Sequence, residues 1–332
     1  MRLVRKVNGG KASALNQALS LADAAIVVGV DADTQLAPNA LALLARWFID
    51  PTIGAVAGNV KVGNRRRLVT RWQSIEYITS QNVDRRAMSR LNAITVVPGA
   101  IGAYRKAALD EVGGYRSDTL AEDMDLTWRL RRARWIAVNE PDAYAYTEAP
   151  ETLGGLMRQR FRWSFGTLQC LWKHRSATFR YGWFGGLALP TLWVFQIGAQ
   201  VIAPLVDLQL VLAALGWVMS WIASLQHVEV MPTSESPVLL VAIVYVAFLG
   251  LEIAAGWLAY AFDNEDKRDL WLLPTQRVVY RQIMYIVVWR ALMRAFGGAG
   301  QAWGKLARTG GVHMGDERVT EERIHPGERE LS

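Results

Sequence analysis

The sequence contains little cysteine and little histidine, and this scarcity narrows the classes of protein to consider. Cys170 is the only cysteine, which excludes an internal disulfide and fits a reducing compartment. The cysteine and the four histidines form no zinc-finger spacing, and there is no aromatic-basic RNA-binding signature. Because these motifs are missing, the net charge of +7 is not interpreted as a sign of nucleic-acid binding. It favours contact with anionic lipid or with phosphorylated substrates.

Charged residues are also scarce, at 20% of the chain against 52% hydrophobic residues. With a mean hydropathy of +0.11, this balance argues against a purely soluble protein. The 14 tryptophans are many for 332 residues, and they fit either an interfacial aromatic belt or surfaces that stack on sugars. The length allows one large domain and a second region.

Residues 1–150 are predicted to form a soluble α/β domain, because short apolar runs alternate there with helical patterns. We expect strands at 26–30, 53–60 and 95–97, and helices at 13–22 and 38–48. This alternation predicts a mostly parallel sheet with helices packed against it.

Residues 151–184 differ, because basic side chains interleave with aromatic ones around Arg160, Phe161 and Trp163. The pattern predicts an amphipathic helix that lies along a membrane interface. A basic surface helix of a soluble protein is the alternative, and the segment alone does not decide between them.

Residues 185–298 carry the membrane signal. The run 185–224 is long enough for two spans hinged near 203–207, whereas 237–262 gives a further span and 278–296 a weaker one. The arginines of the weaker span need interfacial or protein contacts. We therefore expect three or four transmembrane helices, followed by a polar cytoplasmic tail over 299–332.

Asp31 and Asp33 directly follow a seven-residue apolar run that ends at Val30. Open α/β sheets bind ligands beyond the carboxyl ends of their strands, and paired carboxylates there suit a hard divalent cation. An ordinary acidic turn after a strand is the simpler explanation for an isolated Asp-x-Asp. Three further motifs along the chain favour the cation site.

Each of these motifs has both a structural and a chemical interpretation. Lys11 follows a Gly-Gly turn before a helix and can lie beside phosphates, although such turns are common. Glu122 and Asp123 suit the first turn of a helix, and one of them, best Asp123, can act as a general base. The segment Gln159–Trp163 combines a guanidinium suited to diphosphate with an indole suited to stacking on sugar.

In this order, ahead of a membrane region, the motifs resemble those of the processive inverting family 2 glycosyltransferases. This group contains the cellulose, hyaluronan and poly-N-acetylglucosamine synthases, and the likeness is greatest to poly-β-1,6-N-acetylglucosamine synthase-like enzymes. It covers about residues 1–310 and is supported by the segments 97–105, 111–115 and 303–310. The resemblance implies a GT-A type, Rossmann-like α/β domain that is N-terminally incomplete, followed by an α-helical transmembrane region.

The resemblance also implies roles at the donor side of a site. Asp33, with Asp31, would hold Mg²⁺ or Mn²⁺ against the diphosphate of a UDP-sugar, and Lys11 would lie beside the phosphates. Asp123 would deprotonate the acceptor hydroxyl, and Glu122 would help to shape the acceptor site.

At the acceptor side, Gly99 would leave room for a sugar ring, and the acceptor end would be lined by Gln159, Arg162 and Trp163. The implied partners are the UDP-sugar, a growing polysaccharide, the lipid bilayer and accessory export subunits, with no nucleic acid. The implied location is the inner (plasma) membrane, crossed several times, with the catalytic domain in the cytoplasm.

Two departures from the family pattern stand out. Ala121 occupies a position where the family usually has Thr, which alters local hydrogen bonding more than chemistry. Family members also begin with membrane spans, a first strand and an Asp-Asp pair that recognises uracil and ribose, and none of these precedes Asn8. We therefore expect an N-terminally truncated chain that lacks the first part of the nucleotide pocket.

The hypothesis that the motifs favour is a membrane-bound, metal-dependent, processive β-glycosyltransferase that uses UDP-N-acetylglucosamine. One alternative is transfer of a single sugar to a lipid carrier, which the Gln-x-x-Arg-Trp motif and the C-terminal spans oppose. Another is a catalytically inactive membrane subunit, which the missing half-site favours and the retained acidic residues oppose.

Overall fold

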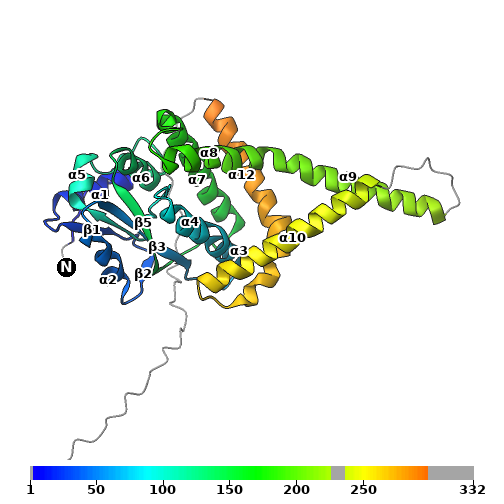
Figure 1. Cartoon of the computed structure of the whole chain (residues 1–332), viewed down its shortest axis with the longest axis horizontal. Helices are drawn as coiled ribbons and strands as arrows, with labels where there is room; N and C mark the ends of the chain where they lie inside the picture. The colour runs from blue at the N-terminus through cyan, green and yellow to red at the C-terminus, as the bar shows by residue number, and fades with distance from the viewer. Residues whose placement is uncertain (1–2, 226–235, 298–332) are drawn as a thin grey trace, which may run out of the picture.

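The computed structural model describes residues 3–225 and 236–297, without the side chains of 236–242. A five-stranded sheet with helices on both faces forms one part of the molecule, and two long helices extend from it (Figure 1). The tail predicted at 299–332 and the motif at 303–310 lie outside the described residues.

The strands are β1 (Ile26–Gly29), β2 (Thr34–Leu36), β3 (Ile53–Val62), β4 (Gly102–Arg105) and β5 (Ile136–Thr147). The helices around the sheet are α1 (Gly10–Ser20), α2 (Ala40–Ala45), η1 (Arg46–Ile49), α3 (Leu68–Glu76), η2 (Tyr77–Asn82), α4 (Val83–Arg90), α5 (Lys106–Glu111), α6 (Glu122–Arg132) and α7 (Leu153–Lys173). The later helices are η3 (Arg175–Ala177), η4 (Phe184–Ala188), α8 (Leu189–Thr191), η5 (Leu192–Gly198), α9 (Ala199–Leu225), α10 (Ser236–Phe262), η6 (Lys267–Leu272), α11 (Leu273–Thr275), η7 (Gln276–Tyr280) and α12 (Arg281–Phe296).

The sheet is mixed, so the prediction of a mostly parallel sheet is wrong. Its order is β1-β4-β3-β5-β2, and within the described residues β3 and β5 form the one parallel pair. β4 is antiparallel to both β1 and β3, and β2 is antiparallel to β5. The predicted strands β1 and β3 do run the same way, and so does β5, which the sequence analysis did not predict. The short strand β2 follows β1 through residues 30–33 alone, whereas α3, η2 and α4 lie between β3 and its antiparallel neighbour β4. The helices of that connection therefore do not make the two strands parallel.

The link between β1 and β2 crosses one edge of the sheet. These two strands lie at opposite ends of the strand order, although only residues 30–33 separate them in sequence. The Asp31–Asp33 segment therefore runs along the edge at which β1, β3 and β5 end.

Most of the elements predicted in the α/β region are confirmed. The strands expected at 26–30 and 53–60 are β1 and β3, and the expected helices correspond to α1 and to α2 with η1. The strand expected at 95–97 does not form. The Val97 N–H instead donates to Thr127 Oγ1 at 2.9 Å, and Trp128 Nε1 donates to the Thr95 carbonyl at 2.7 Å. Side chains of α6 thus satisfy the backbone groups that a neighbouring strand would have used.

The core lies on both faces of β3, whose ten residues are all buried. On one face, Leu44 and Phe48 of α2 and η1 pack against Val56 and Val60. On the other face, side chains of α1, α5 and α6 pack against the alternate residues of β3, among them Ala55 and Ala57. This two-sided burial follows from the period of two along a strand and holds α6 firmly over the sheet.

Two described helical runs are long and apolar enough to cross a membrane, judged by length and composition. Phe184–Leu225 is one continuous run of 42 residues, and Ile243–Phe262 is the other. The run passes through Pro204 inside α9, so the hinge predicted near 203–207 is not observed. Figure 1 shows α9 and α10 extending away from the sheet. The weaker span expected at 278–296 corresponds to the end of η7 and to α12, which packs with α7 and α9.

A buried polar network joins the end of α10 to the sheet-containing part. Asp263 is 2% exposed, and its carboxylate accepts hydrogen bonds from Asn59 of β3 at 3.1 Å, Asn82 at 2.8 Å and Arg86 of α4. Next to it, Lys61 of β3 forms a 2.8 Å ion pair with Glu265. Because buried polar groups need partners, these bonds fix where α10 meets the sheet.

We predict that Asp263→Ala lowers the free energy of unfolding by about 3–5 kcal/mol, because it leaves buried polar and cationic partners unpaired. The measurement is denaturant or thermal unfolding of the chain in detergent micelles. Asp110→Ala is the matched control, since Asp110 pairs with Lys106 at 2.8 Å and its side chain is 53% exposed. The control should change the stability by no more than about 0.5 kcal/mol. Equal effects of the two substitutions would contradict the structural role of the network.

Candidate active site

A small pocket lies where β1 ends, where α1 and α6 begin, and where the loop before β4 passes. Its free volume is about 10 Å³, close to one water, because side chains fill most of it. It brings together five of the residues singled out in the sequence. The lining residues are Lys11, Leu15, Gly29, Val30, Asp31, Pro98, Gly99, Tyr104, Tyr115, Glu122 and Asp123.

Lys11 is the cation of this pocket. Its Nζ lies 2.8 Å from Asp31 Oδ1 and 3.0 Å from Glu122 Oε1, so it joins the segment after β1 to the first turn of α6. Gly10, with φ of +82°, opens α1 in a backbone conformation that favours glycine and directs the chain into the site. Burial acts to lower the pKa of Lys11, but the carboxylates of Glu122, Asp31 and Asp123 outweigh it and raise that pKa.

Asp123 is the buried acid of the pocket. Its Oδ2 accepts a hydrogen bond from the Gly99 N–H at 3.2 Å, and its Oδ1 accepts one from the Met124 N–H at 2.8 Å. Burial, followed by the charge of Glu122, raises the pKa of Asp123 to about 6, and Lys11 opposes this shift. A carboxylate with a raised pKa can accept a proton near neutral pH, as a general base must.

Gly99 allows these groups to approach one another. A Cβ at this position would lie 2.6 Å from Lys11 Nζ and 3.7 Å from an oxygen of both Asp31 and Asp123. A larger residue would therefore displace the lysine or separate it from the acids.

Asp33 lies beyond the residues that line the pocket, in the segment that crosses the edge of the sheet. Among the described residues, no group of three or more His, Cys, Asp or Glu side chains is arranged to hold a metal ion. Asp31 and Asp33 nevertheless offer hard oxygen donors, which suit Mg²⁺ or Mn²⁺ when substrate phosphates and water complete the ligand set. The donor chemistry therefore fits a divalent cation that is bound together with a diphosphate.

The Gln-x-x-Arg-Trp motif lies on α7, outside the pocket around Lys11. Gln159 is buried, Arg162 is half-buried, and Trp163 packs against the buried cluster that includes Ala100 and Ile101, just after Gly99. The motif thus contributes to the same core cluster as the two residues that follow Gly99.

Arg160 lies inside the same motif, and the sequence indicated it only as part of the basic-aromatic pattern, without a role in the site. It is buried, forms a 2.9 Å ion pair with Glu76, and places its guanidinium over the Trp163 ring, 4.2 Å from the ring centroid. A cation stacked on an aromatic face restrains that ring. Its ion-pair partner Glu76 lies 84 positions earlier in the chain, so no local pattern could have shown the pairing.

Tyr104 and Tyr115 were also missed as members of the pocket. Their rings meet edge to face with centroids 6.3 Å apart, and burial raises the pKa of Tyr115 to about 12. Asn16 of α1 holds the Tyr115 backbone in both directions, with two 2.8 Å hydrogen bonds. The Gly-Gly-Tyr sequence at 113–115 was the available signal, because both glycines have positive φ.

The middle of α7 contacts Leu120 and Ala121, the two residues just before Glu122 and Asp123. The Leu120 N–H donates to Gln169 Oε1 at 2.8 Å, and a Cβ at Gly166 would lie only 2.8 Å from the Ala121 Cβ. The position at which the family usually has Thr is therefore packed against α7 with little room to spare. Helix α7 thus positions the start of α6 as well as carrying the Gln-x-x-Arg-Trp motif.

Comparison with known proteins agrees with this geometry. The family model described as "Glycosyl transferase family group 2" matches residues 26–254, more than half of the chain. The poly-beta-1,6-N-acetyl-D-glucosamine synthase of Staphylococcus epidermidis is 35% identical over 162 residues, which cover 48% of this chain and 39% of that protein. The synthase of the same name from Staphylococcus aureus (strain COL) is 32% identical over 174 residues, 52% of this chain and 42% of that protein. The matched part of the chain thus spans about two fifths of the length of these relatives.

Among solved structures, the mannosyltransferase PcManGT from Pyrobaculum calidifontis, in complex with GDP-Man and Mn2+, is similar with a TM-score of 0.47 and 21% sequence identity. The alignment covers 88% of this chain and 68% of that one. A likeness this distant says nothing about substrate or metal. The family match rests on the sequence that carries β1, the acidic pair and α7, and by it the chain belongs to glycosyltransferase family group 2.

Proposed function

We propose that this chain transfers a sugar, N-acetylglucosamine, from a UDP-sugar to the end of a growing β-linked polysaccharide at the plasma membrane. The observation that carries the proposal is the meeting of Asp123, Glu122, Asp31 and Lys11 in one pocket at the carboxyl edge of the sheet. The similarity to poly-beta-1,6-N-acetyl-D-glucosamine synthases supports the choice of sugar and of polymer.

In the proposed reaction, Asp123 is the general base. It takes the proton of the acceptor hydroxyl while the hydroxyl oxygen forms a bond to the anomeric carbon of the donor. The bond between that carbon and the diphosphate breaks at the same time, and UDP leaves with the electron pair. One displacement of this kind inverts the anomeric centre. The Gly99 N–H holds the carboxylate of Asp123 in place.

Asp31 and Asp33 are the residues that would hold Mg²⁺ or Mn²⁺, which as a Lewis acid stabilises charge on the diphosphate leaving group. Lys11 supplies a second positive charge at the same place. Since its ammonium pairs with both Asp31 and Glu122, a diphosphate must compete with these carboxylates for it. Arg162 would add a guanidinium fork to the leaving phosphates.

Trp163 and Gln159 are proposed to bind the acceptor end of the polymer. Trp163 is held by Arg160 on one side and by Tyr77 at a ring-centroid distance of 6.4 Å. An indole restrained in this way offers a preorganised surface for a sugar ring.

A membrane setting is supported by the helices after residue 184. The most apolar window of Phe184–Leu225 has no buried residues, and α9 exposes large apolar side chains along its length. Before it, Trp172, Phe179 and Trp183 are also exposed, as expected for aromatic side chains at a membrane interface. We propose that 151–184 lies at that interface, that 185–298 crosses the bilayer three or four times to form the export path, and that residues 1–150 face the cytoplasm. Accessory export subunits would act at the far side.

The test of function is a panel of labelled UDP-sugars given to membranes that carry the chain, with Mg²⁺ or Mn²⁺. We expect long polymer from UDP-N-acetylglucosamine and loss of product when the metal is chelated. A lipid carrying a single sugar, or no turnover with any donor, would contradict the proposal.

The pH profile tests the role of Asp123. Because the base must be deprotonated and its pKa is raised to about 6, the rate should fall as the pH drops through about 6. At pH 5 we expect about one tenth of the plateau rate. Asp123→Asn should abolish transfer but leave UDP binding, measured by calorimetry, largely unchanged. An acid limb near pH 4, or loss of UDP binding in the variant, would assign the base elsewhere.

The aromatic surface is tested by Trp163→Ala. We expect polymer formation to fall at least about tenfold, since stacking on the acceptor is lost, while UDP-sugar binding is kept. Trp163→Phe should retain most activity. Trp172→Ala is the matched control on the same helix, because Trp172 is 67% exposed, and it should polymerise as the parent chain does. Equal losses in Trp163→Ala and Trp172→Ala would argue against acceptor stacking.

A further inference from the structure

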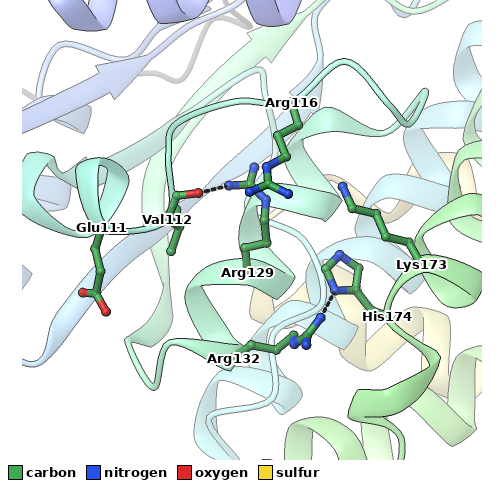
Figure 2. A pocket seen from close by; sticks show the side chains of 7 residues that line it. All are labelled: Glu111, Val112, Arg116, Arg129, Arg132, Lys173 and His174. Carbon is green, nitrogen blue, oxygen red and sulfur yellow. Dashed lines mark hydrogen bonds between the residues drawn. The ribbon is translucent and has the colours of Figure 1, made fainter.

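A second cavity, separate from the Lys11 pocket, opens between the ends of α5 and α7 and the later turns of α6 (Figure 2). Its volume is about 490 Å³, within the range of small-ligand sites. Its lining is dominated by nitrogen-bearing side chains. The lining residues are Glu111, Val112, Arg116, Arg129, Arg132, Lys173 and His174.

The acid in this lining does not neutralise the cations. Glu111 accepts a 2.8 Å hydrogen bond from Trp135 Nε1, and Figure 2 shows its carboxylate turned away from the arginines. The same view shows Arg116 and Arg129 extending their guanidinium groups toward the same part of the cavity. Like charges gather in this way where an anion can bind between them.

The carboxylates of Asp125 and Asp118 accept hydrogen bonds from only some of the N–H donors that line the cavity. Asp125 is fully buried. Its carboxylate lies 2.8 Å from Arg129 Nε, 2.6 Å from Lys173 Nζ and 2.8 Å from His174 Nε2. Burial acts to raise the pKa of Asp125, but these hydrogen bonds hold it well below its usual range. Lys173 also pairs with the exposed Asp118 at 2.7 Å. Lys173 is therefore satisfied by acids, whereas the arginines have donors left over.

The decisive group is Arg129. Its side chain is more than nine-tenths buried, its Nη1 donates to the Val112 carbonyl at 2.7 Å, and its Nη2 has no hydrogen-bond partner among the described residues. A buried guanidinium donor without an acceptor is uncommon. Because Nη2 has less than 1 Å² of accessible surface, an anion in the cavity would become its acceptor once a neighbouring side chain moves aside. Arg132, bonded to His174 Nδ1 at 2.9 Å, and the exposed Arg116 offer further donors around it.

We propose that this cavity binds a phosphate group, held by Arg129 Nη2 together with Arg116 and Arg132. Guanidinium forks match the oxygens of phosphate, and here two come from α6 and one from the loop after α5. Together with Lys173 the three arginines outnumber Asp125, Asp118 and Glu111 by one charge, so the site is net positive. The phosphate belongs either to a soluble compound or to a lipid headgroup. The site does not depend on the proposed sugar transfer, because none of its residues lines the Lys11 pocket. It does share α6 with that pocket, since Asp125 lies two residues after Asp123.

The test uses the whole chain in detergent micelles, with inorganic phosphate titrated against chloride at constant ionic strength. A ligand that binds the folded state raises the thermal unfolding midpoint in a saturable way. We expect this response in the parent chain and in the control Arg66→Ala, whose residue is exposed and far along the chain from the cavity. In Arg116→Ala/Arg132→Ala the apparent phosphate affinity should fall at least about fivefold. Lys11→Ala should keep the response, which separates this site from the proposed donor pocket.

A response that never saturates, that is unchanged in the double variant, or that disappears in Lys11→Ala would overturn the proposal. Vesicles of phosphatidylcholine with and without phosphatidic acid then identify the source of the phosphate. If a headgroup fills the site, phosphatidic acid should remove the effect of added phosphate in the parent chain but not alter the double variant. If the ligand is soluble, the effect of phosphate should be the same in both kinds of vesicle. Sugar transfer is measured separately, so its failure would leave this result standing.

Discussion

Three carboxylates from two segments of the chain share one buried pocket, and the ammonium of Lys11 makes this arrangement possible. Asp31 follows β1, whereas Glu122 and Asp123 begin α6, and without a cation their charges would repel one another. Lys11 pairs with two of them and opposes the rise in the pKa of the third. The same balance of charges explains the proposed chemistry. In the proposed complex the diphosphate would pair with the ammonium of Lys11, and a metal ion would pair with the carboxylates.

Helix α7 connects this pocket to the rest of the molecule. One stretch of it carries Gln159, Arg162 and Trp163, the next packs against Ala121 immediately before the acidic pair, and the last reaches Asp125 through Lys173 and His174. Its outer side packs against α12 and the first turns of the long apolar run Phe184–Leu225. A helix with contacts of this kind links the proposed acceptor surface, the proposed base and the long apolar helices, as the proposed processive transfer would require.

The sequence predicts the parts of this arrangement that depend on local pattern. An apolar run followed by acids predicts β1 and its position at the carboxyl edge, and Lys11, Gly99, Glu122 and Asp123 do meet there. Other parts depend on partners distant in the chain. Strand β4 has only four residues, Gly102–Arg105, and the segment at 95–97 is bonded by side chains of α6. Arg160 is buried beside Glu76, which is distant in sequence. The mixed sheet and the basic cavity follow from such contacts, which a single sequence does not encode locally.

The central claim is that one displacement occurs at the anomeric carbon with Asp123 as the base. The most direct measurement is the NMR coupling of the anomeric proton in the first linkage formed from an α-configured UDP-sugar. The account predicts a β linkage in every product chain. An α linkage would contradict it, because a single in-line displacement inverts the anomeric carbon and cannot turn an α-configured donor into an α-linked product.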